Sequence, residues 1–429
     1  MTAVADQTFV QALLDVEVAL AAAEADVGLV PASAVPHIEA AAQAQAFDLQ
    51  ALAEAALADG NALIPLVRRL TELVAARHQE SAHFVHRGAT SQDIIDTAVV
   101  LRLRDASATM CEQITTAMHA AARLARAHAT TPMAGRTWLQ QGSPTTFGLK
   151  AAGWLDLLGR ARERVRESTS RAAVIQLGGA TGTLAALGTH GPAVTRAMAQ
   201  RLDLQVPDMP WHTHRDRLVE VATSYGIACG AFGKVGRDLT LLAQSEVGEA
   251  TESGGGGSSS MPHKQNPVRA VLAVSAATRA PGLVSTMLAA MPQEHERAAG
   301  GWQAEWQTLA DLSSVTIESA TAIASALGAL TVNVEAMRRN LALNGGVAMA
   351  ESLSAALAPH VGRRDAMALV ERLCRLSARE GRSLQDVARA DAEVTRWFSG
   401  DEVARILAPD SFLGSSSVFV DRVLHRWSE

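Results

Sequence analysis

The sequence predicts an all-α protein built from long helices with apolar faces. Of its 429 residues, 48% are hydrophobic and only 4% are aromatic. Alanine and leucine dominate, which favours helix over sheet. Apolar residues recur at helical spacing over long stretches that end at glycine or proline. A chain of this length exceeds one ordinary core, so we expect two or three domains.

The N-terminal region is predicted to form a helical domain over residues 1–105. Its first helix has apolar residues in a four-three alternation, namely Phe9, Leu13, Val16, Leu20, Ala23 and Val27. Gly28 and Pro31 end this helix. Helical runs continue to Leu73, and a further helix is expected from Thr90 to Arg104. Thr90 can cap that helix, with Asp93 three residues later.

Residues 106–344 are predicted to form a central long-helix bundle. Ser143-Pro144 is a start signal for a long helix that reaches about Arg166. The glycine-rich breaks are Leu177–Thr183 and Gly254–Ser260. Between Val268 and Met291 we expect a buried helix pair with a kink or turn at Pro281. Residues 345–429, with turn glycines and an irregular tail, are expected to form a small C-terminal helical domain.

Composition and charge exclude several classes of function. The net charge of −6 comes without a basic tract, so no nucleic-acid partner is expected. The three cysteines are widely spaced without metal-ligand pairing, which favours a reduced, cytoplasmic location and no metal. The first residues show no basic region followed by an apolar core and a cleavage site, so secretion is not expected. Arg269, Arg279 and Pro281 interrupt the most apolar stretch, so no membrane span is expected.

The segment Gly254–Pro267 is the most informative part of the chain. A flexible linker is one interpretation of its Gly/Ser composition, but a linker does not require Met261, Pro262 and Lys264. Only three of the 38 basic residues are lysines. A lysine in this polar loop therefore indicates that the compact ammonium group of Lys264 has a specific function. Asn266 is expected to cap a helix that begins at Pro267, so the loop would end at the anion-binding end of a helix.

Three motifs resemble those of the fumarase/aspartase superfamily. Ser258–Pro267 is similar to its signature, and His86–Asp93 and Gly135–Gln140 resemble two further segments in the same chain order. The resemblance implies a three-domain helical fold. It also implies a homotetramer in which the central domains pack together and each active site is made from three chains.

The resemblance also implies the chemistry and the site. These enzymes remove a proton from the carbon next to a carboxylate, and they hold the resulting carbanion as an aci-carboxylate. Ser258 would be the base, and Lys264 and Asn266 would stabilise the developing charge. The expected substrate is a small polycarboxylate, and neither cofactor nor metal is expected. The predicted substrate-binding residues are Thr90, Ser91, Arg87, Arg136, Thr137, Trp138, Gln140, Ser259 and Met261.

Other polar residues allow simpler interpretations. Taken alone, Thr90 would be interpreted only as a helix cap. Its position in the motif His86–Asp93 favours a role in substrate binding instead. His212 and His214 suggest a metal pair, but no carboxylate or cysteine lies at ligand spacing, so a polar helix entry is favoured. His295 and Arg297 are candidates for the pocket lining or for surface ion pairs with neighbouring glutamates.

The chain departs from the superfamily pattern at two positions. Trp138 stands where fumarases and adenylosuccinate lyases have a histidine, and Val271 replaces the glutamate paired with it in those enzymes. A departing amine or hydroxide needs a general acid, whereas a carboxylate leaves as an anion because its acid has a pKa of about 4. This chemistry matches the carboxymuconate cycloisomerase branch, which Gly135–Gln141 and Gly300–Trp306 resemble most. The resemblance implies interconversion of 3-carboxy-cis,cis-muconate and 4-carboxymuconolactone in protocatechuate catabolism.

Three alternatives remain open. One is a lyase that eliminates an acid-independent group such as nitrite from a substituted succinate. An adenylosuccinate lyase-like activity is less favoured, because Trp306 stands where those enzymes have an arginine. The third is a non-catalytic helical scaffold, against which the intact Ser258, Lys264 and Asn266 argue.

Overall fold

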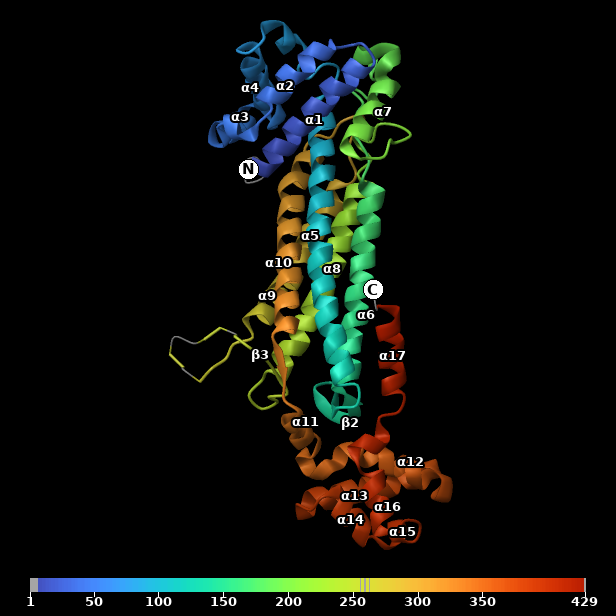
Figure 1. The fold of residues 1–429 in the computed structure, drawn as a ribbon. Helices are drawn as coiled ribbons and strands as arrows, with labels where there is room; N and C mark the ends of the chain where they lie inside the picture. The colour runs from blue at the N-terminus through green and yellow to red at the C-terminus, as the bar shows by residue number, and fades with distance from the viewer. Residues whose placement is uncertain (1–6, 255, 258–259, 262, 428–429) are drawn as a thin grey trace. The chain divides into compact units, whose positions relative to one another are not determined.

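The computed structural model describes residues 7–254, 256–257, 260–261 and 263–427, and helices dominate it (Figure 1). The prediction of an all-α fold is confirmed. The chain divides into two compact units, each made of three segments. The first comprises 1–112, 161–230 and 276–319, and the second comprises 113–160, 231–275 and 320–429.

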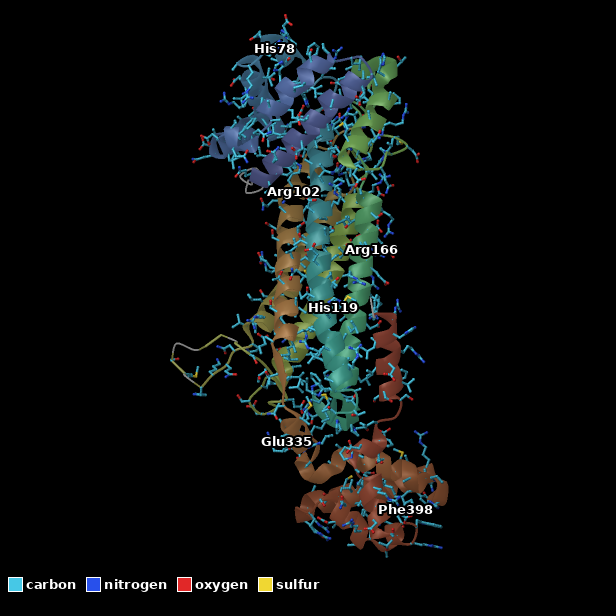
Figure 2. All side chains as sticks on the ribbon, viewed as in Figure 1. His78, Arg102, His119, Arg166, Glu335 and Phe398 are labelled. Carbon is cyan, nitrogen blue, oxygen red and sulfur yellow. The ribbon has the colours of Figure 1, made fainter. Side chains whose placement is uncertain are left out.

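Five long helices supply segments to both units. They are α5 (Ser91–Ala127), α6 (Phe147–Ala172), α8 (Asp216–Leu242), α9 (Val268–Ala290) and α10 (Gly301–Gly328). In the first unit, polar contacts join these helices between apolar layers. Ser107 on α5 hydrogen-bonds Thr169 on α6 at 2.6 Å and Tyr225 on α8 at 2.7 Å. Charged residues such as Arg166 lie exposed on the outer faces (Figure 2).

The first unit also contains the N-terminal helices and their core. The helices are α1 (Gln7–Asp26), α2 (Val35–Ala41), α3 (Leu49–Asp59), α4 (Leu63–Ala75) and α7 (Gly191–Leu202), with 3-10 turns at Ala32–Ala34, Ala44–Ala46, Gln79–Phe84 and Ala185–His190. Leu13, Leu20 and Leu66 are buried in the core that these helices share with the start of α5. Burial of this apolar face, at about 25 cal/mol per Å², holds the start of α5 in place.

The second unit contains two small antiparallel sheets and the C-terminal helices. Strand β1 (Pro132–Thr137) pairs with β2 (Gln140–Thr146), and β3 (Ala250–Glu252) pairs with β4 (Leu330–Val332). The remaining elements are α11 (Val334–Leu341), α12 (Ala350–Val361), α13 (Arg363–Glu380), α14 (Leu384–Ala390), α15 (Ala392–Thr395), α16 (Gly400–Ile406) and α17 (Ser416–Arg426), with 3-10 turns at Leu343–Met349 and Pro409–Phe412. Leu353, Leu357 and Leu373 are at the centre of the C-terminal core.

Several predicted boundaries were wrong. Helix α5 continues to Ala127 rather than ending at Arg104, so the boundary expected at residue 105 falls inside it. Ser143-Pro144 does not start a helix but lies in β2, and α6 starts at Phe147. Proline is tolerated there because a two-stranded sheet leaves every strand an unpaired edge. The three-domain division stays a prediction.

Helix α9 also differs from its prediction. It is one helix that contains Pro281, not a helix pair, because a proline removes one hydrogen bond without necessarily ending a helix. It is not buried in the single chain, since Val271, Leu272 and Leu288 are 52%, 56% and 52% exposed. By length and composition alone, α9 is the one described helix that could cross a membrane. The helical segments 334–341 and 343–361, which are bent by 82° relative to one another, are long and apolar enough only if they are counted as one span.

Candidate functional site

The turn before α5 holds the predicted carboxylate-binding residues Thr90 and Ser91. Helix α5 begins at Ser91, and the amide of Thr90 donates to the carboxylate of Asp93 at 2.9 Å. Both residues are half-buried. Within the described part of the chain, neither hydroxyl has a hydrogen-bond partner. The turn therefore has donors that a carboxylate could accept at a helix N-terminus.

Asp93 is the centre of the polar network below this turn. Its carboxylate is fully buried and also accepts the amides of Gly178 and Gly179, each at 2.9 Å. Nε2 of His212 lies 2.7 Å from the same group. His212 thus pairs with a carboxylate, in agreement with the polar helix-entry interpretation. One side chain fixes three chain segments around the turn.

A second buried polar network joins α5, the start of α8 and α10. The guanidinium of Arg215 binds Asp96 at 2.7 Å and Glu305 at 2.6 Å, and all three groups are almost fully buried. Burial alone would lower the pKa of Arg215, but Asp96 and Glu305 hold it above its usual value. Trp302 donates its indole N–H to Asp96 at 2.9 Å. Removing one partner of such a buried pair typically costs about 3–5 kcal/mol.

Arg87 lies beside a pair of buried acids on α1. It donates to the carbonyl of Leu29 at 2.7 Å, which ties the turn to the end of α1. Glu17 lies 2.6 Å from Nδ1 of His86. Glu24 is fully buried, and neither of its carboxylate oxygens has a partner among the described residues. Burial raises the pKa of Glu24 to about 8, against the lowering effect of Arg87.

The motif Gly135–Gln140 forms the tip of the β1–β2 hairpin. Thr137 pairs with Gln140 across a two-residue turn made by Trp138 and Leu139. Both turn residues have positive φ, 53° and 63°, a backbone conformation that usually requires Gly or Asn. Trp138 is 98% exposed in the single chain. Large apolar residues in this conformation store strain, which is common at functional sites.

Arg136 makes a structural ion pair. Its terminal nitrogens bind both oxygens of Glu249, at 2.8 and 2.6 Å, and Glu249 is fully buried. Asn340 donates to the same carboxylate at 2.7 Å. Each terminal nitrogen donates one hydrogen bond to Glu249, and the use of Arg136 as a substrate clamp stays a prediction. Through Glu249 and Asn340, this ion pair joins the tip of the hairpin to α11.

The signature segment folds back on itself before α9. The backbones of Gly256 and Asn266 bond one another at 3.2 and 2.9 Å, and the side chain of Asn266 donates to the carbonyl of Gly257 at 3.3 Å. Lys264 and Met261 are exposed. The catalytic prediction for Ser258 and the substrate-binding prediction for Ser259 fall on positions outside the described residues.

The predicted cap of α9 was wrong. The helix begins at Val268, one residue later than expected, and the side chain of Glu252 on β3 caps it. The amide of Arg269 donates to Oε2 of Glu252 at 3.3 Å, and that of Ala270 donates to Oε1 at 2.9 Å. A buried carboxylate therefore already occupies the positive end of this helix. If an anion binds at this segment, the compensating positive charge would have to come from side chains such as Lys264.

The predicted site residues fall into two groups. The first unit holds Arg87, Thr90 and Ser91, and the second holds Arg136, the hairpin tip and the signature segment. Within each group the structure brings together segments that are distant in the sequence. Sequence reasoning missed the shared role of Asp93 and the cap by Glu252. The capping-box spacing pointed to Asp93, but no local pattern links Glu252 to amides 17 and 18 residues later.

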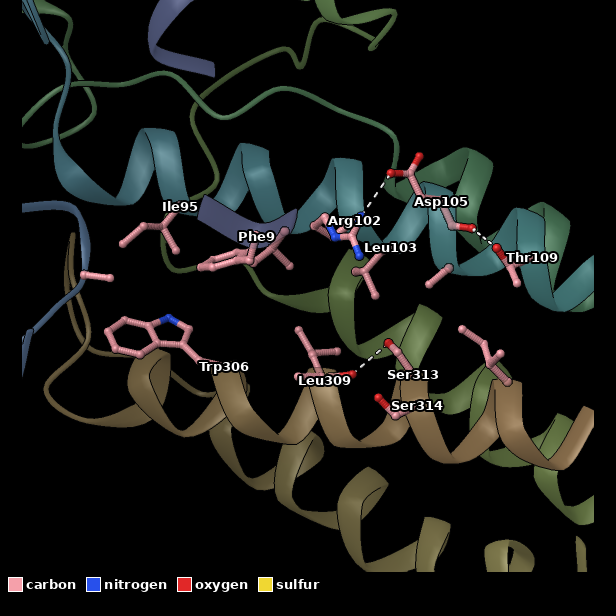
Figure 3. Close-up of a pocket in the computed structure, with 15 residues that line it drawn as sticks. Phe9, Ile95, Arg102, Leu103, Asp105, Thr109, Trp306, Leu309, Ser313 and Ser314 are labelled. Atoms are coloured by element: carbon pink, nitrogen blue, oxygen red, sulfur yellow. Dashed lines mark hydrogen bonds and ion pairs between the residues drawn. The ribbon is translucent and has the colours of Figure 1, made fainter. Parts of the chain in front are cut away.

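A cavity of about 340 Å³ lies elsewhere in the first unit (Figure 3). Phe9, Ile95, Leu103, Trp306 and Leu309 form most of its apolar wall, and none of the predicted site residues lines it. Arg102 and Asp105 lie at its edge in an exposed ion pair of 3.5 Å. A largely apolar cavity does not suit a polycarboxylate, so we do not assign the substrate to it.

Comparison with known proteins shows similarity to lyases and cycloisomerases over nearly the whole chain. A family model described as Lyase matches residues 1–282, and one described as Adenylosuccinate lyase C-terminus matches 346–423. A 3-carboxy-cis,cis-muconate cycloisomerase of Pseudomonas aeruginosa is 49% identical, covering 98% of this chain and 92% of its own. A nitrosuccinate lyase of Streptomyces davaonensis is 40% identical over 98% and 91%. The crystal structure of the 3-carboxy-cis,cis-muconate lactonizing enzyme from Pseudomonas putida is 45% identical, covers 98% and 95%, and has a TM-score of 0.93.

Proposed function

Because the chain belongs to the lyase family of the fumarase/aspartase superfamily, we propose that it is a cycloisomerase. Its substrate and product would be 3-carboxy-cis,cis-muconate and 4-carboxymuconolactone. Two relatives that are named 3-carboxy-cis,cis-muconate cycloisomerase match 98% of the chain at 49% and 46% identity. The reaction is an intramolecular addition of a carboxylate to a double bond, and its reverse is a β-elimination.

The observation that carries the acid-independent chemistry of this proposal is the pair Trp138 and Val271, and the higher identity to the named cycloisomerases favours their substrate. These two residues stand where related lyases have a proton-transferring histidine and its glutamate. Trp138 forms the hairpin tip and is 98% exposed in the single chain, and Val271 is 52% exposed on α9. Neither side chain can donate a proton to a leaving group. An enzyme with these residues suits a leaving group that departs as a stable anion, such as a carboxylate.

The proposed mechanism uses one proton-transfer group. In the lactonising direction, a substrate carboxylate adds to C4 and Ser258 protonates the carbanion at C5. In reverse, the alkoxide of Ser258 takes that proton, the electron pair forms the C4–C5 double bond, and the ring carboxylate leaves. The intermediate is a doubly charged aci-carboxylate, which Lys264 and Asn266 would stabilise. A serine ionises only where positive charge favours its anion, so Lys264 would also support the base.

We propose in addition that the active form is a homotetramer with shared sites. Helix α9 exposes Val268, Val271 and Leu272 on one face, at helical spacing i, i+3 and i+4, and the hairpin exposes Trp138. Apolar side chains that cluster on a helix face are normally covered by a partner. A second copy of the chain would cover this face and bring further residues to the site. We also propose that the protein is cytoplasmic, as the sequence predicts.

Direct assay of the purified protein tests the activity. Incubation with fresh 3-carboxy-cis,cis-muconate should reduce the diene absorbance and produce the lactone. The variant Ser258→Ala should lose this activity while keeping its fold and oligomeric state. An unchanged diene signal with the unaltered protein would reject the cycloisomerase.

Elimination of nitrite from nitrosuccinate is the second candidate. The similarity to a nitrosuccinate lyase favours it, and nitrite also leaves without a general acid. Formation of fumarate from nitrosuccinate, without turnover of 3-carboxymuconate, would replace the first proposal with this one. Trp138 does not distinguish the two reactions, because neither requires protonation of the leaving group.

A further inference from the structure

The glycine-rich loop Gly178–Leu184 has no role in the reaction as proposed so far. The amide of Leu184 donates to the carbonyl of Gly178 at 2.9 Å, which closes the loop. Gly179 and Gly182 have φ of 69° and 82°, a conformation that favours glycine. Ala180, Thr181 and Thr183 are exposed. The loop is therefore a closed turn with an exposed tip.

This loop is attached to the carboxylate-binding turn. The amides of Gly179 and Thr90 donate to the same oxygen of Asp93, each at 2.9 Å. A Cβ on Gly179 would lie 3.3 Å from the carbonyl oxygen of Gly88, so the two backbones approach closely. From the other side, Arg297 donates to the carbonyl of Ala180 at 2.7 Å and to Gln92 at 2.7 Å. The loop and the turn thus form one preorganised surface.

The tip of this loop presents unused donors. Within the described part of the chain, the amides of residues 180–183 and the hydroxyls of Thr181 and Thr183 have no hydrogen-bond partner. The guanidinium of Arg297 adds positive charge at the loop carbonyls. The negative charge of Asp93 is buried below and shared among four donors. Consecutive free amides with adjacent positive charge are typical of an anion-binding site.

The proposed substrate requires one more anion site than those described. It has three carboxylates: one adds to C4, one becomes the aci-carboxylate, and the one on C3 takes no part in bond formation. Resting on the proposed function, we infer that Thr181 and Thr183, with the amides of residues 180–183, bind the C3 carboxylate. The loop would therefore select a tricarboxylate over substrates that lack this group.

Matched substitutions of the two threonines test the inference. The double variant Thr181→Val/Thr183→Val removes both hydroxyls at nearly constant shape. It should raise KM for 3-carboxymuconate roughly tenfold, as expected for lost hydrogen bonds to a charged group, with little change in kcat. The variant Thr181→Ser/Thr183→Ser should restore KM, because it keeps the hydroxyls. Thr189→Val, in the exposed 3-10 turn that follows, is the matched control and should leave KM unchanged.

A second measurement identifies the carboxylate that is bound. cis,cis-Muconate lacks the C3 carboxylate, so its inhibition constant should be the same for the unaltered protein and the valine variant. An unchanged KM in the valine variant, a serine variant as weak as the valine one, or an inhibition constant that rises with KM would overturn the inference. If cis,cis-muconate does not inhibit at all, the valine and serine comparison decides. Failure of the proposed function is a separate outcome, in which the unaltered protein does not consume 3-carboxymuconate.

Discussion

Single residues decide which reaction this scaffold can support. Trp138 occupies the tip of a hairpin whose two turn residues both have positive φ. The indole cannot transfer a proton, and it would give the proposed site a flat apolar surface that suits a diene. The strained turn holds this surface out from the chain, where it is 98% exposed. Both the chemistry and the position of this residue therefore favour a leaving group that departs as an anion.

The substitution Trp138→His tests this account. Histidine tolerates positive φ better than most residues, so the hairpin should remain folded. We expect kcat/KM for 3-carboxymuconate to fall at least about tenfold, equivalent to about 1.4 kcal/mol, because the apolar contact is lost and no proton is needed. Steady-state kinetics measure this effect, and thermal melting checks the fold. Nearly unchanged kinetics would mean that Trp138 only packs against a neighbour.

The buried acid Glu24 gives stability a pH dependence. Its pKa is raised from 4.5 to about 8 by burial, so the folded chain binds a proton that the unfolded chain has released above pH 4.5. Stability associated with this group is complete below pH 4.5 and is lost as the pH rises to about 8. Glu24→Gln, which cannot ionise, should reduce the fall in melting temperature between pH 5 and pH 9. An identical pH profile for the two proteins would show that Glu24 does not titrate in this range.

At the scale of elements, buried carboxylates hold the site segments together. Asp93 joins the turn before α5 to the loop after α6 and to His212. Glu249 joins the hairpin to α11 through Arg136 and Asn340. These side chains accept backbone and side-chain donors from distant parts of the sequence. They position the segments that we propose bind the substrate.

Glu252 has the same role for α9. Its carboxylate accepts two amides of the first turn, so Glu252→Ala should lower the free energy of unfolding by about 1–2 kcal/mol, as for loss of a helix cap. Thermal or denaturant melting measures this, with Glu246→Ala, an exposed glutamate nearby, as the control. The activity should fall as well, because the signature segment leads directly into α9. Equal stability of the two variants would mean that water replaces the cap.

At the scale of the whole molecule, the sequence predicted the helical fold and the motifs, but not how they are anchored. Helical periodicity and the signature Ser258–Pro267 are local patterns, so they could be recognised directly. The cap by Glu252 and the pairing of Arg136 with Glu249 depend on contacts between distant segments, which no local pattern encodes. The expected helix start at Ser143-Pro144 failed because the pairing of β1 with β2 overrode a local signal.

The exposed face of α9 leads to a prediction about assembly. Leu272 is 56% exposed in the single chain, and placing a charge at a buried subunit interface is strongly unfavourable. Leu272→Arg should therefore yield smaller species than the homotetramer that we propose, as measured by size-exclusion chromatography with light scattering. Activity should fall together with the mass, because shared sites cannot form in isolated chains. Leu57→Arg on α3, where the leucine is 64% exposed, is the matched control and should leave the mass unchanged. If the Leu272→Arg variant remains a tetramer, this face of α9 is exposed to solvent and is not the proposed subunit interface.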